Sequence, residues 1–542
     1  MRKNEKVVFV LLVVFVFFCM FAGCGKKNKS SDAAAPTTVP AAAGADKTIN
    51  INVGAGTAGV EAWSAVVDGY TGLNPNVKVV VDLKPGEGYA DWIRAMFASQ
   101  NPSADLVNIN VAGAAASGKQ INFMEYVNNI SPYSNKPWRE QFNLEMQNSI
   151  DYGKNTLYSL SLESVQVLWL YNKDIFDKVG IKPPATWVEF VDVCEQLQLA
   201  GYQPLAVPGD FKSFWEMQVG WLAQIYLDQT TRSMIEVYRS QDGDYNYDPD
   251  VDGVFKLDIT DPFNDDPWKV NQNPMRYFNA LKDGIIQPDS VGFKTVMTRF
   301  KDIFPKYAGG DAFFGTNENG WITLFYQGKA AIALDATWRL AYFKNDMDRI
   351  RDGRGFKLNM KTVEGINEFQ LGTFNMPSME GPGIEAPART IEVSSGSIGA
   401  VKKNKEHDDL VVDFLMYYTS REGYSNYLKG QASGGGVPGG PCLVYGVELP
   451  ADYAALFENI SFIGNCQKGF GVDIARGAPG DVQESLREWY GYTQDFFTDK
   501  ITVDQWGELH KVNIMKYFND ALVAKHINPG DLDNPANAPT GD

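Results

Sequence analysis

Cysteine and histidine are both scarce in this chain, and their scarcity excludes several classes of protein. Of the five cysteines, only Cys194, Cys442 and Cys466 lie outside the N-terminal leader region. A disulfide-built fold is therefore excluded, although Cys442 and Cys466 could pair. The three histidines are scattered, with no cysteine at metal-ligand spacing. We therefore expect neither a zinc site nor a cofactor.

Positive charge is in short supply as well. Lys and Arg number 49 against 66 Asp and Glu, which gives a formal net charge of −17. Nucleic-acid binding depends on Lys and Arg contacts to phosphate, so the balance argues against a nucleic-acid partner. The sequence also contains neither G-x-S-x-G nor H-E-x-x-H. This absence disfavours the serine hydrolases and zinc proteases that use those motifs.

A long apolar run occurs only at the N-terminus. Basic residues precede the apolar stretch 7–21, and the small residues of "FAGCG" follow it. A membrane-spanning helix needs about 20 apolar residues, so this shorter run predicts a secretory signal peptide, residues 1–23. The "FAGC" tetrad resembles a bacterial lipobox, with Phe21 where Leu is usual, which implies lipidation of Cys24. The alternative is an ordinary secretory signal with a chance cysteine.

The segment after the leader favours a location outside the cytoplasm. Residues 24–47 are rich in Ala, Pro, Ser and Thr and lack apolar periodicity, which predicts a flexible tether. We therefore expect a folded body, starting near Lys47, that is lipid-anchored on the extracytoplasmic face of the cell membrane. The tether and the lack of a disulfide framework favour a single-membrane cell.

Three glycines near the start of this body match a nucleotide-binding motif. Gly54, Gly56 and Gly59 have G-x-G-x-x-G spacing after an apolar strand, a pattern that can hold a pyrophosphate. Asp82 follows, but later than the ribose-binding acid of that motif should lie. An exported protein meets no maintained NAD pool. We therefore favour a permissive loop that brings the backbone close to a ligand cleft.

Alternating strand and helix patterns follow this loop. Strands are expected at 48–53, 74–84 and 104–110, and helices at 61–70 and 89–99. This alternation favours a parallel sheet with helices on its faces, hence an α/β fold. Further on, Thr186 and Glu189 form a capping box, and the helix that follows carries Cys194 on its apolar face. The length of the chain favours two large lobes.

Six segments, in order, resemble one protein family. They are "NPNVKVVV", "FASQNPSADLVNI", "YNKDIFDKVGIKPPATWVEF", "FYQGKAAIALDATWR", "GSIGAVKKNKEHDDLVVDFLMYYTSREG" and "GQASGGGVPG". They are similar to segments of the extracellular solute-binding proteins of bacterial ABC importers, of the maltose- and oligosaccharide-binding type. Ala104 replaces a usual Pro, and Ala336 stands where Gly is common.

The resemblance implies a two-lobed α/β fold, like the periplasmic binding proteins, with a hinge and an interlobe cleft that closes on a carbohydrate. It implies a monomer that delivers its ligand to an ABC permease and is not an enzyme. Lobe one is expected at 48–162 plus 391–445, and lobe two at 163–390 plus 446–528. The tail 529–542 is expected to be disordered.

Sugars offer an apolar ring face and a rim of hydroxyls, so their binders need flat aromatic rings and hydrogen-bonding side chains. Trp338 matches the family's Trp and is expected to lie under a sugar ring, or else to be a core residue. Asp335 and Arg339 flank it and suit vicinal hydroxyls, or else form a surface ion pair. Glu163, where the chain first crosses the hinge, is expected to be a cleft carboxylate, or else a solvated strand residue.

Four further residues are expected in the cleft. Trp215 is favoured over Phe214, which at helical spacing fits the core. Asn108 and Asn110 end a strand, where α/β folds bind ligands. Trp63 follows the glycine loop and would face the same cleft from lobe one.

The acidic insert raises the question of calcium. Asp248, Asp250, Asp252 and Gly253 match the first half of a calcium loop, but Ile259 stands where a bidentate Glu is required. We favour a solvated acidic loop over a calcium site.

Two rival functions remain open. The first is a receptor of the same fold for a peptide or a polyol. The second is an exported glycoside hydrolase, which needs two carboxylates about 5 to 10 Å apart across a cleft. Carboxylates in the cleft argue for a neutral ligand over an anion.

Overall fold

The computed structural model describes residues 37–38, 47–54, 59–85, 88–147, 150–151, 155–358, 361–395, 397–434, 436–458 and 460–541. The expected signal peptide 1–23, Cys24 and most of the expected tether lie outside the described residues, as does Gly56. Within the described part of the chain, no helix has both the length and the apolar composition needed to cross a membrane.

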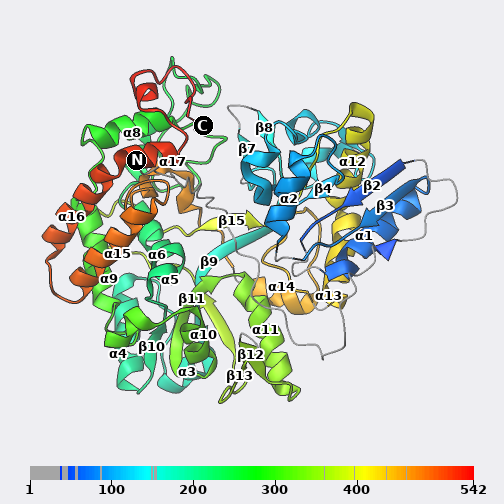
Figure 1. Cartoon of the computed structure of the whole chain (residues 1–542). Coiled ribbons are helices and arrows are strands. Elements are labelled where there is room, and N and C mark those ends of the chain that lie inside the picture. Colours follow the sequence, from blue (N-terminus) through cyan, green and yellow to red (C-terminus); the bar gives the residue numbers. More distant parts are fainter. Residues whose placement is uncertain are drawn as a thin grey trace, which may run out of the picture. The chain divides into compact units, whose positions relative to one another are not determined.

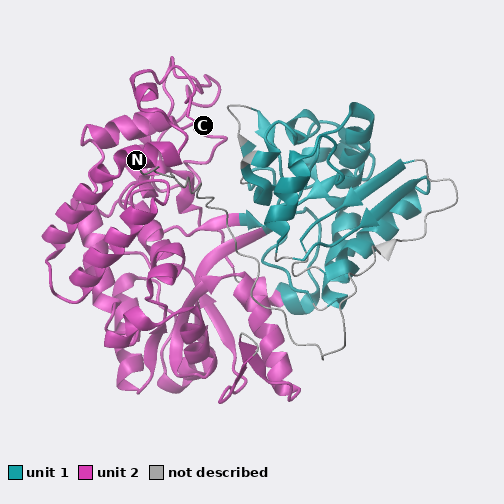
Figure 2. Ribbon diagram, viewed as in Figure 1, with its two compact units in different colours: residues 1–150, 155–163, 394–454 teal, residues 151–154, 164–393, 455–542 magenta. Residues whose placement is uncertain are grey.

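The chain folds into two compact units, which Figure 2 colours separately. Unit 1 comprises Met1–Ile150, Asn155–Glu163 and Ser394–Ala454. Unit 2 comprises Asp151–Lys154, Ser164–Val393 and Ala455–Asp542. The chain therefore passes between the units several times, and its longest stretch in unit 2 begins directly after Glu163. The chain crosses from one unit to the other within four elements: β7 (Ile150–Asp151), β9 (Glu163–Asn172), β15 (Glu392–Ser395) and α14 (Ala451–Phe457).

Unit 1 is an α/β unit. Its other strands are β1 (Thr37–Thr38), β2 (Lys47–Ile51), β3 (Val77–Val81), β4 (Leu106–Val107), β5 (Ile130–Ser131), β6 (Lys136–Pro137), β8 (Thr156–Leu157) and β16 (Gly399–Ala400). Its helices are α1 (Gly59–Leu73), α2 (Tyr89–Ala98), α12 (Lys405–Tyr418) and α13 (Arg421–Ser433).

The main sheet of unit 1 has the strand order β1-β3-β2-β4-β16. β2 pairs in parallel with β3 and β4, while β1 and β16 pair antiparallel at the edges. β3 alternates buried and partly buried residues, and α1 packs on β3 and on α13 (Figure 1). The predicted parallel sheet with covering helices is confirmed for this unit. β1 lies within the segment expected to be a tether, and its pairing with β3 is an addition that composition did not indicate.

The strand predicted at 104–110 is shorter than expected. β4 ends at Val107, and the chain then forms the short 3-10 helix η1 (Ile109–Ala116). The Asn108 N–H donates to the Tyr89 hydroxyl at 3.0 Å. Because this N–H is used outside the sheet, the ladder cannot continue, and Asn110 falls within η1.

Unit 2 has its own sheet and most of the helices. Its other strands are β10 (Gln203–Ala206), β11 (Ala330–Ala336), β12 (Phe356–Leu358), β13 (Lys361–Val363) and β14 (Leu371–Phe374). Its helices are α3 (Lys173–Val179), α4 (Trp187–Leu199), α5 (Phe211–Glu216), α6 (Gln218–Asp228), α7 (Ile235–Tyr238), α8 (Pro274–Lys282), α9 (Val291–Ile303), α10 (Glu318–Tyr326), α11 (Trp338–Arg351), α15 (Gln483–Phe497), α16 (Val503–Lys516) and α17 (Phe518–Ala524).

The main sheet of unit 2 has the order β10-β11-β9-β14, and β15 also pairs with β9. β10 and β11 are parallel, whereas β9 is antiparallel to β11 and to β14. The predicted capping box at the start of α4 is present, with both of its hydrogen bonds. Cys194 lies on the buried face of this helix, as its spacing predicted.

The C-terminal segment is not disordered as predicted. Pro529–Asp533 forms a short 3-10 helix, and Leu532 is buried. The carbonyl of Leu532 accepts a hydrogen bond from Asn279, and that of Pro535 accepts one from Asn273. The polar composition of this tail did not indicate that Leu532 would be buried or that two of its carbonyl groups would accept hydrogen bonds.

The three described cysteines are all free thiols. Cys442 belongs to unit 1 and Cys466 to unit 2, and the structure does not pair them.

Candidate functional site

The ends of the parallel strands of unit 1 converge on Asn108. Its side-chain oxygen accepts a hydrogen bond from the N–H of Gly54 at 2.8 Å, and its amide donates to the carbonyl of Ser397 at 3.3 Å. Asn108 thus ties together the segments after β2 and β4 and the segment before β16. At Gly54, the first glycine of the motif, a Cβ atom would lie 3.6 Å from Asn108 Oδ1, an ordinary contact distance, so the expected close approach does not require glycine there. Asn108 is partly exposed and Asn110 is exposed.

A cluster of aromatic rings lies between α1, α12 and α13. We call the four residues Trp63, Tyr418, Tyr424 and Tyr427 the tyrosine cluster. The ring centroid of Trp63 lies 5.1 Å from that of Tyr418 and 5.5 Å from that of Tyr427. Tyr424 and Tyr427 stack at 5.3 Å. Trp63, expected to face the ligand, is only 3% exposed, because the tyrosines cover it. The partly exposed ring is Tyr427.

Glu163 reaches this cluster from the start of β9. Its Oε2 accepts the N–H of Gly439 at 2.9 Å, and its Oε1 lies 3.4 Å from the hydroxyl of Tyr424. Burial raises the pKa of Glu163 to about 7, although both hydrogen bonds act in the opposite direction. The expected cleft carboxylate is therefore an enclosed carboxyl group that changes protonation near neutral pH.

The candidate residues of unit 2 gather at the end of β11, where α11 begins. The indole N–H of Trp338 donates to Asp335 Oδ1 at 2.9 Å, and Arg339 Nε donates to Asp335 Oδ2 at 2.6 Å. Trp338 itself is partly exposed. The structure therefore holds the indole in one orientation by its hydrogen bond to the side chain of Asp335.

Asp335 and Arg339 do not form the surface ion pair that was the alternative, because the pair is buried. Their side chains are 2% and 9% exposed. Burial lowers the pKa of Arg339, but the charges of Asp335 and Tyr326 and the hydrogen bonds to both act together in the opposite direction, and the net direction is upward. The guanidinium also lies over the ring of Trp321 at 5.4 Å. Low polarity around the pair favours its mutual contact over contact with a ligand.

Trp215 and Phe214 differ in their exposure. Phe214 is fully buried against Trp489 and Tyr490, whereas Trp215 is partly exposed. The side chain of Arg476 lies over the Trp215 ring at 5.9 Å and donates to the Trp215 carbonyl at 2.7 Å. Trp215 is thus held at the surface of α5.

The carboxylates of the acidic insert accept hydrogen bonds from backbone N–H groups. Asp252 is buried and accepts hydrogen bonds from the N–H groups of Asp248 and Asn271. Asp248 in turn accepts the N–H of Asp250. These carboxylates thus accept hydrogen bonds from backbone N–H groups within the insert and at Asn271. Among the described residues, no group of three or more His, Cys, Asp or Glu side chains could hold a metal ion.

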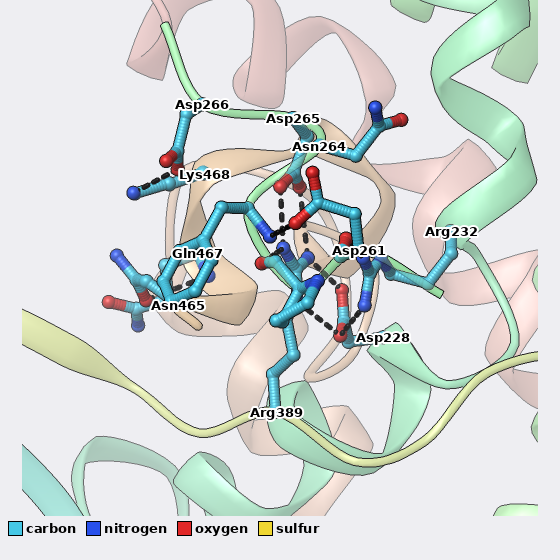
Figure 3. A network of polar contacts seen from close by, with 12 residues as sticks. Asp228, Arg232, Asp261, Asn264, Asp265, Asp266, Arg389, Asn465, Gln467 and Lys468 are labelled. Carbon is cyan, nitrogen blue, oxygen red and sulfur yellow. Dashed lines mark hydrogen bonds and ion pairs between the residues drawn. The ribbon is translucent and has the colours of Figure 1, made fainter. Parts of the chain in front are cut away.

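A buried network of charged residues surrounds Arg389 in unit 2 (Figure 3). Arg389 donates to both oxygens of Asp228, at 2.8 and 2.5 Å, and to both oxygens of Asp265, at 2.5 and 2.9 Å. Burial raises the pKa of Asp228, and the charge of Arg389 offsets part of that effect. Beside it, Lys468 forms an ion pair with Asp266. Asp228 at the end of α6 and Asp265 and Asp266, which follow the acidic insert, are thus the counter-charges for Arg389 and Lys468.

Close packing fixes the path of the chain around this network. Gly464 has φ +92°, and a Cβ atom there would lie 2.4 Å from the Pro262 carbonyl oxygen and 2.8 Å from Arg389 Cδ. Only glycine fits this conformation and this approach.

The sequence analysis missed several residues around the candidate site. The ring of Trp221 lies 6.4 Å from that of Trp338, edge to face. Trp221 and Trp338 lie far apart in the sequence, and no local motif marks them as neighbours. The three tyrosines of the cluster lie on helices more than 250 positions after Glu163, and Tyr424 is 261 positions away. No local spacing could have brought these residues together.

Chemically, both groups of residues suit a neutral, polyhydroxylated ligand. Each combines a partly exposed aromatic ring, Tyr427 or Trp338, with hydrogen-bonding groups beside it. Flat rings accept the apolar face of such a ligand, and amide and carboxyl groups suit its hydroxyls.

Comparison with known proteins identifies a family. A family model described as bacterial extracellular solute-binding protein matches residues 54–425, well over half of the chain. The chain is also 24% identical, over 163 residues, to an uncharacterized ABC transporter extracellular-binding protein from Pyrococcus horikoshii. That match covers 30% of this chain and only 36% of the curated relative.

Among the solved structures with a similar fold, we name three, each from a different bacterium. The apo form of RafE from Streptococcus pneumoniae has a TM-score of 0.53 at 16% identity, over 88% of this chain and 98% of that one. The cyclic alpha-maltosyl-1,6-maltose binding protein from Arthrobacter globiformis has a TM-score of 0.51 at 13% identity, over 87% and 99%. A family 1 extracellular solute-binding protein from Bifidobacterium longum subsp. infantis has a TM-score of 0.50 at 14% identity, over 86% and 98%.

Proposed function

Because the chain belongs to the bacterial extracellular solute-binding protein family, we propose that it is the substrate-binding lipoprotein of an ABC transporter. It captures a carbohydrate, an oligosaccharide in our proposal, in a cleft between its two lobes and delivers it to a membrane permease. The observation that carries the carbohydrate proposal is Trp338, a partly exposed indole that Asp335 holds in a fixed orientation at the end of β11.

A fixed indole is suited to a sugar ring for a physical reason. The pyranose face is apolar and flat, so an indole that is already oriented loses little rotational entropy on stacking. Asp335 and Arg339 then act as positioning residues for Trp338. Trp215 contributes a second aromatic surface on unit 2, and on unit 1 Glu163, Asn108 and Asn110 contribute hydrogen-bonding groups while Trp63 supports the tyrosine cluster.

The name of one similar structure supports the same ligand class. The protein from Arthrobacter globiformis is named for binding cyclic alpha-maltosyl-1,6-maltose. A receptor of the same fold for a peptide or a polyol is the second candidate. An exported glycoside hydrolase is the third, and it would cleave a bound glycan that a receptor leaves intact.

Anchoring at the membrane is also part of the proposal. The "FAGC" segment supports lipidation of Cys24 after removal of residues 1–23, which would hold the protein on the extracytoplasmic face of a single-membrane cell. Cys24→Ser is expected to move the protein from the detergent phase to the aqueous phase. Retention of the variant in the detergent phase would argue for another anchor.

A thermal-shift screen tests the ligand class. Residues 47–542 are heated with a panel of mono- and oligosaccharides, peptides and polyols. A ligand at about 100 times its Kd adds about 2.7 kcal/mol to the stability of the folded state, which shifts the midpoint visibly. A shift with one sugar family that Trp338→Ala removes supports the proposal. Shifts with peptides or polyols alone, or none at all, contradict the carbohydrate assignment.

A matched control separates ligand contact from general damage. Tyr445 is a large aromatic residue of unit 1 that is 56% exposed and is not in the candidate site. Tyr445→Ala is expected to keep the sugar-induced shift. If both variants lose the shift equally, Trp338 has no special role.

A further inference from the structure

The side chain of Glu163 is enclosed by neighbours that disfavour a charged carboxylate. Three tyrosines surround it: Tyr418 from α12, and Tyr424 and Tyr427 from α13. Cys442, in the segment after α13, also lies beside Glu163, because the two residues form an isolated antiparallel β-bridge. Burial raises the pKa of all three hydroxyls and of the thiol. All four neighbours are therefore neutral at physiological pH.

No positive charge is among the causes that shift the pKa of Glu163, which are burial and two hydrogen bonds. This sets Glu163 apart from the buried Asp335 and Asp228, each of which faces an arginine. A buried carboxylate without a counter-charge costs several kcal/mol, so the neutral acid is the favoured form.

The hydrogen bonds leave one carboxyl oxygen weakly held. Oε2 accepts the Gly439 N–H at 2.9 Å, whereas Oε1 is 3.4 Å from the Tyr424 hydroxyl. A proton on Oε1 would disturb neither contact, because a hydroxyl oxygen can either donate or accept. Glu163 is partly exposed as a residue, and Oε1 is the carboxyl oxygen with the longer hydrogen bond.

Resting on the proposed function, we propose that Glu163 takes part in ligand capture as a neutral acid that donates a hydrogen bond to an ether or hydroxyl oxygen of the ligand. Ligand affinity then falls as the pH rises above neutrality. The same residue as a carboxylate would accept hydrogen bonds from ligand hydroxyls, and affinity would then rise with pH.

Titration calorimetry of the mature chain with the sugar that gives the largest thermal shift tests this inference. The Kd is measured between pH 5.5 and 8.5 for the wild type and for Glu163→Gln, an uncharged isostere that can still donate. The wild-type Kd is expected to rise about tenfold for each pH unit above the Glu163 pKa. The Kd of Glu163→Gln is expected to be the same across this range.

A matched control is Glu392→Gln. Glu392 is a buried glutamate of unit 2 whose pKa is also raised by burial, and it accepts a hydrogen bond from Ser164 at 3.0 Å. Because the inference gives Glu392 no part in ligand capture, its variant is expected to keep the wild-type pH profile. Loss of the profile in Glu392→Gln would assign the effect to general stability and overturn the inference.

The possible results separate the two proposals. A sugar that binds with the same affinity at every pH leaves the proposed function standing and overturns the role of Glu163. Affinity that rises with pH, with weak binding by Glu163→Gln at pH 5.5, shows an accepting carboxylate and also overturns it. If the wild type binds no sugar at any pH, the proposed function fails, and this inference fails with it.

Discussion

The orientation of a single side chain, Trp338, depends on a carboxylate that does not itself face solvent. Asp335 accepts hydrogen bonds from the Trp338 indole, from Arg339 and from the N–H of Ala336. Its side chain is 2% exposed. We therefore attribute to Asp335 an indirect role, in which it holds both the indole and the arginine.

Replacing Asp335 by Ala should lower both stability and affinity. Arg339 would remain buried without its ion-pair partner, which costs about 3–5 kcal/mol of unfolding free energy, and Trp338 would lose its hydrogen bond. Urea denaturation and sugar titration measure the two effects. The matched control is Asp352→Ala, whose ion pair with Arg354 is exposed on both sides, and it should cost less than about 1 kcal/mol.

The control also defines the result that contradicts this prediction. If Asp335→Ala destabilises the protein no more than Asp352→Ala, the buried pair contributes nothing. If it destabilises the protein but leaves the Kd unchanged, Asp335 stabilises unit 2 without orienting Trp338 for the ligand.

At the scale of elements, helix α16 carries a buried histidine whose protonation should affect stability. His510 is fully buried and stacks on Trp506 at 4.8 Å. Its Nδ1 lies 2.7 Å from the Tyr492 hydroxyl and its Nε2 lies 2.8 Å from the Ile474 carbonyl oxygen. That carbonyl can only accept, so Nε2 carries the proton and Nδ1 accepts from Tyr492. Burial lowers the pKa of His510 to about 4.

The sign of the pH effect follows from this shift. Below about pH 6.5 the unfolded chain binds a proton at His510 that the folded chain does not bind until about pH 4. The unfolding free energy should therefore fall by up to about 1.4 kcal/mol per pH unit between pH 6.5 and 4. His510→Gln should have a shallower slope in urea denaturation across this window, while the exposed His526→Gln should keep the wild-type slope. Equal slopes in all three proteins would contradict the assignment.

The stability of unit 2 should also depend on Arg389. Arg389→Met leaves Asp228 and Asp265 buried without their shared counter-charge, so we expect a loss of about 3–5 kcal/mol in urea denaturation. Adding Asp228→Asn and Asp265→Asn should recover part of that loss. Arg351→Met, which breaks exposed ion pairs, should cost less than about 1 kcal/mol. Equal losses for Arg389→Met and Arg351→Met would show that the buried network does not stabilise unit 2.

Local patterns predicted some elements and could not predict others. The capping box of α4 and the strands of unit 1 follow from spacing over a few residues, and the contact of Asp335 with Arg339 spans four positions. The neighbours of Glu163 and the partners of Arg389 come from distant segments, so spacing carries no information about them. The tail was misjudged because Leu532 is a lone apolar residue in a polar segment, and its burial depends on the surface that α8 provides.

At the scale of the whole molecule, the question is whether one ligand engages both units. Each unit has its own sheet and its own candidate residues. The proposed function requires that ligand binding involve the tyrosine cluster with Glu163 on unit 1 and Trp338 on unit 2. A ligand held by one unit alone would leave the other group of residues without a role in capture.

Hydrogen exchange with and without saturating sugar distinguishes these cases. At about 100 times its Kd, a ligand adds about 2.7 kcal/mol to the free energy of opening, so exchange through that opening should slow about a hundredfold. We expect slowing in residues 424–434 and 436–442 of unit 1 and in residues 330–343 of unit 2. Residues 503–516, which form α16, serve as an internal reference with no proposed ligand contact. Protection of one unit alone would contradict capture by both lobes. Because stacking restricts opening only in the unit that provides the ring, the protected unit would also show which group of aromatic residues binds the sugar.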